Sequence, residues 1–161
     1  MAKVFLHIGT HKTGTSAIQR MLSQSNNVFY PKTLRLQGQK GEFRYAHHGL
    51  AIAISKKYSR QRGLKRNPAM WDQVSREIES SGHPIAVISS ELLWPCTDEE
   101  ILYLSRSLSQ HETKAIIFFR EPFSYAVSSY KQRVKMNYRY SLRTHIQEQS
   151  WRSGNNGCKM D

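Results

Sequence analysis

Apolar and polar residues alternate in blocks along the chain, and the blocks predict strands that alternate with helices. Residues 3–8, 84–90 and 113–119 are short runs rich in branched and aromatic residues, typical of buried strands. The run at 113–119 is apolar enough that we expect it to be buried on both faces. A shorter run at 28–30, stopped by Pro31, predicts one more strand.

Helical spacing of apolar residues predicts the elements between and after these strands. The expected helices cover about residues 16–25, 48–57, 68–81, 98–108, 122–135 and 142–151. Their apolar faces are expected to include Ala17, Ile18, Met21 and Leu22 in the first helix, and Ile101, Leu102, Leu104 and Leu108 in the fourth. Gly82 ends the third helix, and Thr97 or Asp98 caps the fourth.

This order of elements predicts an α/β fold, a three-layer sandwich with a mostly parallel sheet. We find neither an internal repeat nor an interdomain linker, so we expect residues 1–161 to form a single domain. In such a fold, the loops at the carboxyl ends of the strands form the binding site.

Charge is the unusual part of the composition. Lysine and arginine number 24 against 12 acidic residues, a formal net charge of +12 that predicts a polyanionic partner: nucleic acid, a phosphorylated cofactor or an acidic glycan. Much of the excess lies in residues 32–66, where a merely solvated basic surface is an equal alternative. No apolar run is long enough to span a bilayer, and Cys96 and Cys158 suggest free thiols, so we expect a cytoplasmic protein.

A glycine-containing loop, Gly9–Ser16 (GTHKTGTS), follows the first strand and opens the first helix. In that setting, backbone N–H groups converge on a phosphate at the positive end of the helix. The loop is close to the Walker pattern, but Thr15 stands where that pattern has lysine, and no strand ends in a magnesium-binding aspartate. A nucleoside triphosphatase or a degenerate nucleotide kinase is therefore disfavoured, although the kinase remains an alternative.

The segment HIGTHKTGTSAIQ resembles the 5′-phosphosulfate-binding loop of sulfotransferases that use 3′-phosphoadenosine 5′-phosphosulfate (PAPS). Arg120-Glu121-Pro122, followed by Ser128 and Tyr130, resembles the 3′-phosphate motif of the same family. The two motifs stand in the family's order within a resemblance that covers roughly residues 3–150. They identify the chain as similar to a PAPS-dependent sulfotransferase with a P-loop-like nucleotide-binding fold.

The resemblance implies a set of donor-binding residues. They are Thr10, His11, Lys12, Thr13, Gly14, Thr15 and Ser16 in the loop, with Arg120 and Ser128 for the 3′-phosphate. Lys12 would also neutralise charge on the leaving adenosine 3′,5′-bisphosphate (PAP), and no metal would be needed. Glu91, after the strand at 84–90, is the best candidate for the general base, with a histidine (His7, His11, His47 or His48) as the rival and a capping or ion-pairing role as the plainer alternative.

The acceptor is a hydroxyl or amine that the sequence does not identify, and an anionic glycan is among the candidates. A basic nucleic-acid-binding protein is the alternative of a different class, which no DNA- or RNA-binding motif supports. Sulfotransferases similar to this chain continue well beyond the second motif, so we expect a C-terminal part of the fold to be missing. A homo-oligomer that completes the site is left open.

Overall fold

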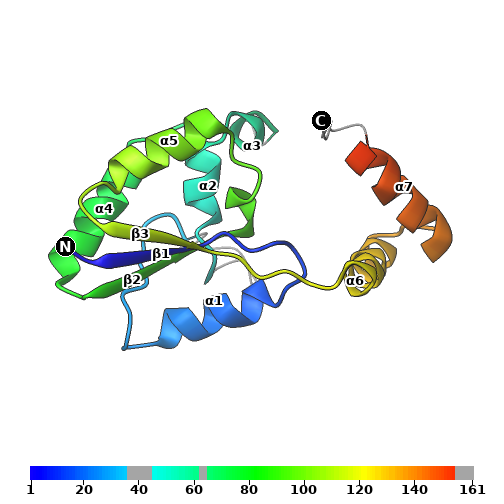
Figure 1. Ribbon diagram of the computed structural model, residues 1–161, viewed down its shortest axis with the longest axis horizontal. Coiled ribbons are helices and arrows are strands. Elements are labelled where there is room, and N and C mark those ends of the chain that lie inside the picture. Colours follow the sequence, from blue (N-terminus) through cyan, green and yellow to red (C-terminus); the bar gives the residue numbers. More distant parts are fainter. Residues whose placement is uncertain (36–44, 62–64, 155–161) are drawn as a thin grey trace, which may run out of the picture. The chain divides into compact units, whose positions relative to one another are not determined.

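The computed structural model describes residues 1–35, 45–61 and 65–154, and it describes side chains as far as residue 148. The chain divides into two compact units, Met1–Phe119 and Arg120–Asp161, each of which is described by itself (Figure 1). The part of residues 32–66 that falls in 36–44 and 62–64 lies outside the described residues, as does Cys158. The single domain expected for residues 1–161 stays a prediction.

The first unit is built on a parallel sheet of three strands, in the order β2-β1-β3. The strands are β1 (Lys3–His7), β2 (Ile85–Ser89) and β3 (Glu112–Ile116). His7 pairs with Ser89 on one side and with Ile116 on the other, so all three strands end at the same edge of the sheet. This confirms the predicted α/β class with a parallel sheet.

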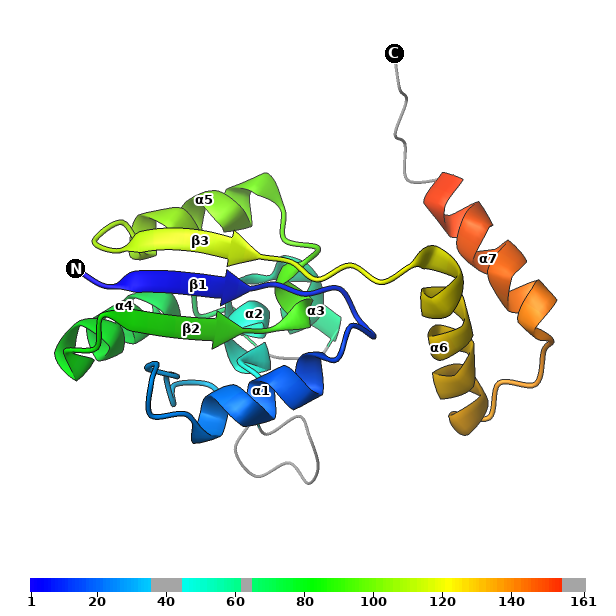
Figure 2. The same ribbon diagram turned by 60° about the horizontal axis from the view of Figure 1, so that its bottom comes forward.

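Helices cover both faces of this sheet (Figure 2). One face carries α1 (Thr15–Gln24), and the other carries α2 (His48–Ile54), α4 (Met70–Ser81) and α5 (Asp98–Ser107). The short helices α3 (Lys56–Gln61) and η2 (Glu91–Leu93) follow α2 and β2. Buried apolar side chains of the sheet and of α2, α4 and α5 form the core: Val4, Leu6, Leu50, Ile54, Trp71, Val74, Ile78, Ala86, Ile88, Leu104 and Leu108.

The helix boundaries follow from local chemistry that the sequence shows. Gly82 ends α4 in the left-handed conformation, with φ +67°, which glycine adopts at little cost. Thr97 caps α5, accepting the N–H of Glu100 while the Glu100 carboxylate accepts the N–H of Thr97. Both predictions are confirmed, and Thr97 rather than Asp98 is the cap.

Two strand predictions need correction. Residues 28–30 form only an isolated bridge, in which Phe29 exchanges backbone hydrogen bonds with Ile85 and Val87, because Pro31 has no N–H with which to extend the pairing. The strand at 113–119 is shorter than predicted and is not buried on both faces: Thr113, Lys114 and Ala115 are exposed. Within the described residues β3 is an edge strand, so its outer side has no neighbour.

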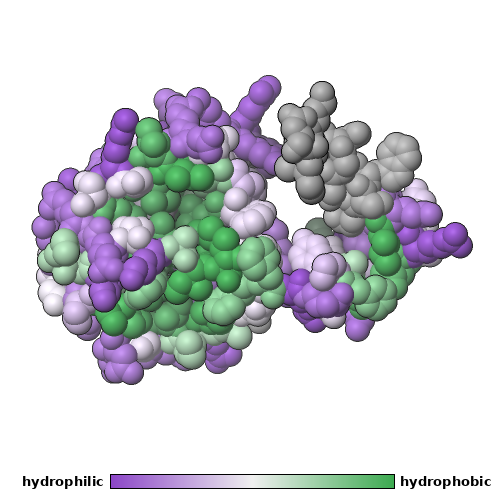
Figure 3. Space-filling model, viewed as in Figure 1, coloured by the Kyte–Doolittle hydropathy of each residue, from purple (hydrophilic) through white to green (hydrophobic). Residues whose placement is uncertain are grey.

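The apolar faces predicted for two helices are also partly wrong. Ile101 and Leu102 of α5 are 52% and 55% exposed, and Met21 of α1 is 63% exposed. Figure 3 shows hydrophobic side chains gathered on one face of the first unit, between α5 and α1. The buried residues of α1 are instead two polar ones, Thr15 and Gln19.

The second unit is a pair of helices, α6 (Pro122–Lys135) and α7 (Leu142–Gly154), close to the predicted ranges. Arg133 of α6 bonds to Glu148 of α7 at 3.0 Å and lies 3.3 Å from Nδ1 of the buried His145. The motif residue Tyr130 donates its hydroxyl to the carbonyl of Tyr140, so its role in the structure is to hold this helical pair together.

Within the described residues, we find no helix whose length and apolar character would let it cross a membrane.

Candidate phosphate-binding site

The loop between β1 and α1 has an unusual backbone. Gly9, Lys12 and Gly14 all have positive φ, at 35°, 69° and 83°. For a residue with a Cβ, such as Lys12, this conformation costs on the order of 1–3 kcal/mol and is concentrated at functional sites. Turns of this kind also aim successive N–H groups into one concavity, where an anion can bind.

Side chains of the loop fix this backbone. Thr13 Oγ1 donates to the carbonyl of Thr10 at 2.7 Å, and Thr10 Oγ1 donates to the carbonyl of Phe118 at 3.1 Å. The first bond closes the loop on itself, and the second ties it to the segment after β3. Both hydroxyls, which we predicted as ligand-binding groups, therefore use their protons to hold the loop, while their oxygens remain able to accept.

The N-terminus of α1 begins at a glycine. Gly14 is the N-cap and has no side chain with which to cap the helix, and the first turn of α1 has no acidic residue. The predicted Ser16 lies here, half-buried, and Thr15 is buried. An uncapped helix start with no acidic residue favours an external anion, because its N–H groups and the helix dipole are positive there.

Beneath the loop lies a buried imidazole. A Cβ placed on Gly9 would be 2.9 Å from Thr15 Cγ2 and 3.3 Å from His7 Nε2, so only glycine fits between them. His7 is 2% exposed, its Nδ1 lies 2.8 Å from Ser89 Oγ, and its Nε2 has no hydrogen-bond partner in the described structure. Burial lowers the pKa of His7, and the nearby Glu91 charge opposes that shift. An unsatisfied buried group of this kind costs about 1–3 kcal/mol and calls for an explanation.

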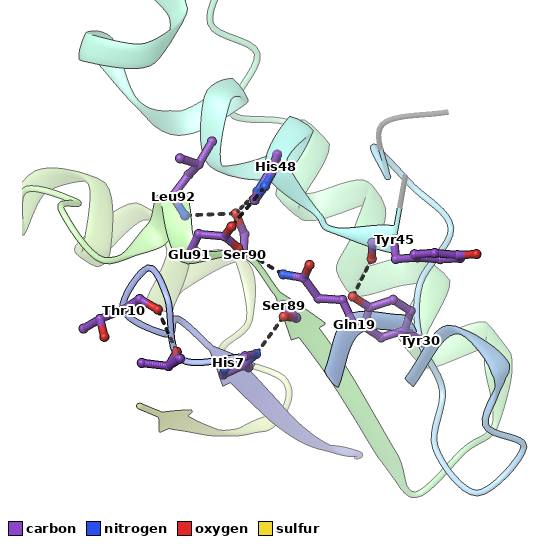
Figure 4. Close-up of polar contacts among 11 residues, drawn as sticks. His7, Thr10, Gln19, Tyr30, Tyr45, His48, Ser89, Ser90, Glu91 and Leu92 are labelled. Atoms are coloured by element: carbon purple, nitrogen blue, oxygen red, sulfur yellow. Dashed lines mark hydrogen bonds and ion pairs between the residues drawn. The ribbon is translucent and has the colours of Figure 1, made fainter. Parts of the chain in front are cut away.

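The end of β2 holds two histidines through two consecutive serines (Figure 4). Ser89 contacts His7 from β1, and Ser90 Oγ lies 2.8 Å from Nδ1 of His48 at the start of α2. Ser90 Oγ also accepts the N–H of Leu92 at 3.3 Å, which caps η2. Ser90 is fully buried, so it is not available as a nucleophile.

Glu91, the predicted base, lies between α1 and α2. Its Oε2 accepts from Gln19 Nε2 at 3.1 Å, and its Oε1 lies 3.6 Å from His48 Nε2. The side chain of Glu91 is 12% exposed, that of His48 is 5% exposed, and Gln19 is 2% exposed as a residue. Figure 4 shows the carboxylate between these two partners. The structure thus brings Glu91 to the helix that the phosphate loop opens.

A second layer supports this end of β2. His47 Nε2 donates to the carbonyl of Pro31 at 2.8 Å, and its Nδ1 accepts the N–H of Ser89 at 3.1 Å. Burial lowers the pKa of His47 to about 4, so the ring is neutral in neutral solution. Tyr30 packs against this ring and donates to the carbonyl of Tyr45 at 2.7 Å, and burial raises its pKa. His47 therefore has a structural role.

The predicted 3′-phosphate motif lies in the second unit. Arg120 and Ser128 line one cavity of about 250 Å³, together with Phe123, Ser124, Val127 and Lys131. The cavity thus brings the two predicted residues together and adds the cation of Lys131. The start of α6 is closed, however: the Glu121 carboxylate accepts the N–H groups of Phe123 and Ser124, both at 2.7 Å. These bonds, from Ser124 first and then Phe123, lower the pKa of Glu121.

The structure groups the sequence-predicted residues into two sets. Lys12, the loop and Glu91 belong to the first unit, and Arg120 and Ser128 belong to the second. His11 is an exposed loop residue with no direct part in these contacts. Gln19 was not among the residues predicted from the sequence, and His48 was predicted only as a rival base. A polar residue four positions after Thr15, on the same side of the helix, was the signal available for Gln19.

Comparison with known proteins adds no relative: no family model, no curated protein and no solved structure matches the chain. What can be said of function therefore depends on the residues and their geometry.

Proposed function

We propose that this chain binds PAPS and transfers its sulfuryl group to an acceptor hydroxyl or amine. The observation that carries the proposal is the loop at Gly9–Ser16. Among the described residues, its helix start has no side-chain cap, its backbone has three positive φ angles, and a buried imidazole nitrogen without a hydrogen-bond partner lies beneath it.

The described residues fit a 5′-phosphate group at this loop. Thr15 and His7 pack against Gly9 where a Cβ would lie, so glycine lets the loop sit directly over the buried imidazole. The loop and the first turn contain Lys12 and no carboxylate. In the second unit, Arg120 and Lys131 beside the Ser128 hydroxyl offer the charge and hydrogen bonding that a 3′-phosphate needs.

Bound PAPS would supply the sulfuryl group: the acceptor oxygen or nitrogen bonds to sulfur, the bond from sulfur to the 5′-phosphate oxygen breaks, and the electron pair leaves with PAP. Glu91 would take the acceptor's proton. Lys12 and the loop amides would stabilise the negative charge that develops on the leaving phosphate oxygen. Arg120 and Ser128 would hold the 3′-phosphate and so orient the donor.

Ligand-dependent thermal unfolding tests this proposal. PAP should raise the melting temperature far more than AMP or ATP with Mg²⁺, because we expect the chain to bind PAP more tightly. At a hundredfold excess over its Kd, a ligand stabilises the folded protein by about 2.7 kcal/mol. Arg120→Ala should remove most of the difference between PAP and AMP, because only PAP has the 3′-phosphate. Arg139→Ala, which removes an exposed arginine from the same unit, is the matched control. Equal shifts by PAP and AMP in the unmutated protein would contradict the proposal.

A further inference from the structure

Three side chains from three elements form one polar group at the phosphate loop, which we name the carboxylate clamp: Gln19, His48 and Glu91. Gln19 comes from α1, His48 from α2 and Glu91 from η2. Each oxygen of the carboxylate faces its own partner, Gln19 at 3.1 Å and His48 at 3.6 Å. The charged group is thus approached from two sides, and only a small part of it reaches solvent.

The direction of the hydrogen bonds in the clamp follows from the surroundings of Ser90. Its oxygen accepts the Leu92 N–H, and its proton can be donated to His48 Nδ1, 2.8 Å away, when the neutral ring carries its own proton on Nε2. In this tautomer the protonated Nε2 is the nitrogen that faces Glu91. The opposite neutral tautomer would set a nitrogen lone pair against a carboxylate oxygen, which is repulsive.

Burying the polar side chains of the clamp lowers the stability of the fold, so we expect the carboxylate to have a function. Burying a carboxylate and an amide that could be replaced by apolar residues is rarely the most stable solution for a core. Gln19 lies on the second turn of the helix whose first turn forms the phosphate loop. Any group bound at the start of α1 is therefore held by the same rigid helix that holds Glu91 Oε2.

We propose that Gln19 and His48 are positioning residues that fix the Glu91 carboxylate relative to the phosphate loop, so that it can accept a proton from the acceptor. This inference rests on the proposed function. Gln19 sets the distance from Glu91 to α1, and His48 prevents rotation of the carboxylate about its last bond. Neither residue belongs to the loop that is proposed to hold the donor, so we expect donor affinity not to depend on them.

The test compares donor binding and turnover in the full chain. Transfer from ³⁵S-labelled PAPS is measured with N-acetylglucosamine, desulfated heparin, 4-nitrophenol, tyramine and water as acceptors. Gln19→Leu and His48→Leu should each lower kcat about 10- to 100-fold, the usual effect of a misplaced catalytic group, with KM for PAPS unchanged. His48→Gln, whose amide can still donate to Glu91, should recover most of the rate.

Matched controls separate positioning from general damage. Gln24→Leu makes the same change at an exposed site of α1, and His83→Leu removes an exposed histidine; both should keep the unmutated rate. The PAP-induced rise in melting temperature should be the same in the clamp variants as in the unmutated protein, which shows that they fold.

Failure of the inference and failure of the proposed function give different results. Unchanged kcat in both leucine variants of an active protein, or no recovery in His48→Gln, overturns the clamp and leaves the proposed function standing. If PAP binds but no acceptor is modified, Glu91 is not a base and the clamp is wrong, while donor binding is retained. If PAP does not stabilise the unmutated chain, the proposed function is wrong and the inference falls with it.

Discussion

The helix starts of α1 and α6 lie within the two segments that resemble phosphate-binding motifs, yet they are built differently. Within the part of the chain that the structure describes, the start of α1 has neither a side-chain cap nor an acidic residue. The start of α6 is capped by Glu121, whose carboxylate occupies the N–H groups of Phe123 and Ser124. The loop at α1 can therefore offer backbone amides to a phosphate, whereas the α6 motif has to rely on the side chains of Arg120, Ser128 and Lys131.

The difference matters for what each region contributes. Backbone amides at a helix start are fixed in space and lose little freedom when an anion binds. Side chains such as Arg120 and Lys131 lose rotamer entropy when they are immobilised. We therefore expect the loop at α1 to supply positioning for the chemistry, and the α6 motif to supply discrimination between nucleotides.

The largest effect is expected next to the loop. Glu91→Gln should lower sulfuryl transfer by about 10²–10⁴, because the amide cannot accept the acceptor's proton, and should leave PAP affinity nearly unchanged. Lys12→Ala should reduce both, since Lys12 belongs to the loop itself. Parallel measurements of turnover and of PAP affinity check this prediction. Turnover retained in Glu91→Gln would move the base to another residue.

As the pH falls, protonation of the histidines near the phosphate loop should lower stability before protonation of Glu121 weakens the cap of α6. The pKa of His47 is lowered from 6.5 to about 4 by burial, so the unfolded chain binds the proton more readily. The free energy of unfolding therefore has its full value, as far as His47 is concerned, above pH 6.5. It decreases by at most about 3 kcal/mol as the pH falls from 6.5 towards 4. The lowered pKa of His7 acts in the same direction, whereas the lowered pKa of Glu121 keeps its carboxylate charged to more acidic pH.

Urea unfolding at pH 7 and pH 5 measures this dependence. His47→Gln should be less stable at pH 7 but should show a smaller loss on acidification. His83→Gln, at an exposed site, should lose as much stability as the unmutated protein. An equal loss in all three proteins would show that His47 is not responsible.

Two glycines of the loop provide a smaller and more local test. Both Gly9 and Gly14 have positive φ, but a Cβ on Gly9 would meet Thr15 Cγ2 at 2.9 Å, while a Cβ on Gly14 would meet nothing within 4 Å. Gly9→Ala should therefore weaken PAP binding about tenfold more than Gly14→Ala, because it adds a steric displacement of the loop to the backbone strain that both share. Calorimetric titration with PAP gives the two affinities. Similar losses would place the ligand away from Gly9.

The sequence was enough to predict the elements that carry the site but not the packing around it. The parallel strands, the loop after β1 and the position of Glu91 after β2 follow from local patterns: apolar runs, glycines and capping residues. The exposed Ile101 and Leu102 and the edge position of β3 were not predictable, because burial depends on which elements are neighbours in space. The clamp was missed for the same reason. Gln19, His48 and Glu91 are far apart in sequence, and only the fold places them together.

The smallest effect is expected at α6, where one substitution can make the helix start resemble that of α1. Glu121→Gln removes a negative charge beside Arg120 and weakens the cap, so an anion can compete for the N–H groups of Phe123 and Ser124. PAP affinity should rise by a few-fold at low salt and less at 0.15 M salt, since the interaction is exposed and screened. Amide exchange at Phe123 and Ser124 should become faster in the free variant and return towards that of the unmutated protein when PAP is added. The prediction is wrong if PAP affinity is unchanged and PAP does not slow the amide exchange. The 3′-phosphate then does not lie at the start of α6, and the loop at α1 is the remaining phosphate site of the proposal.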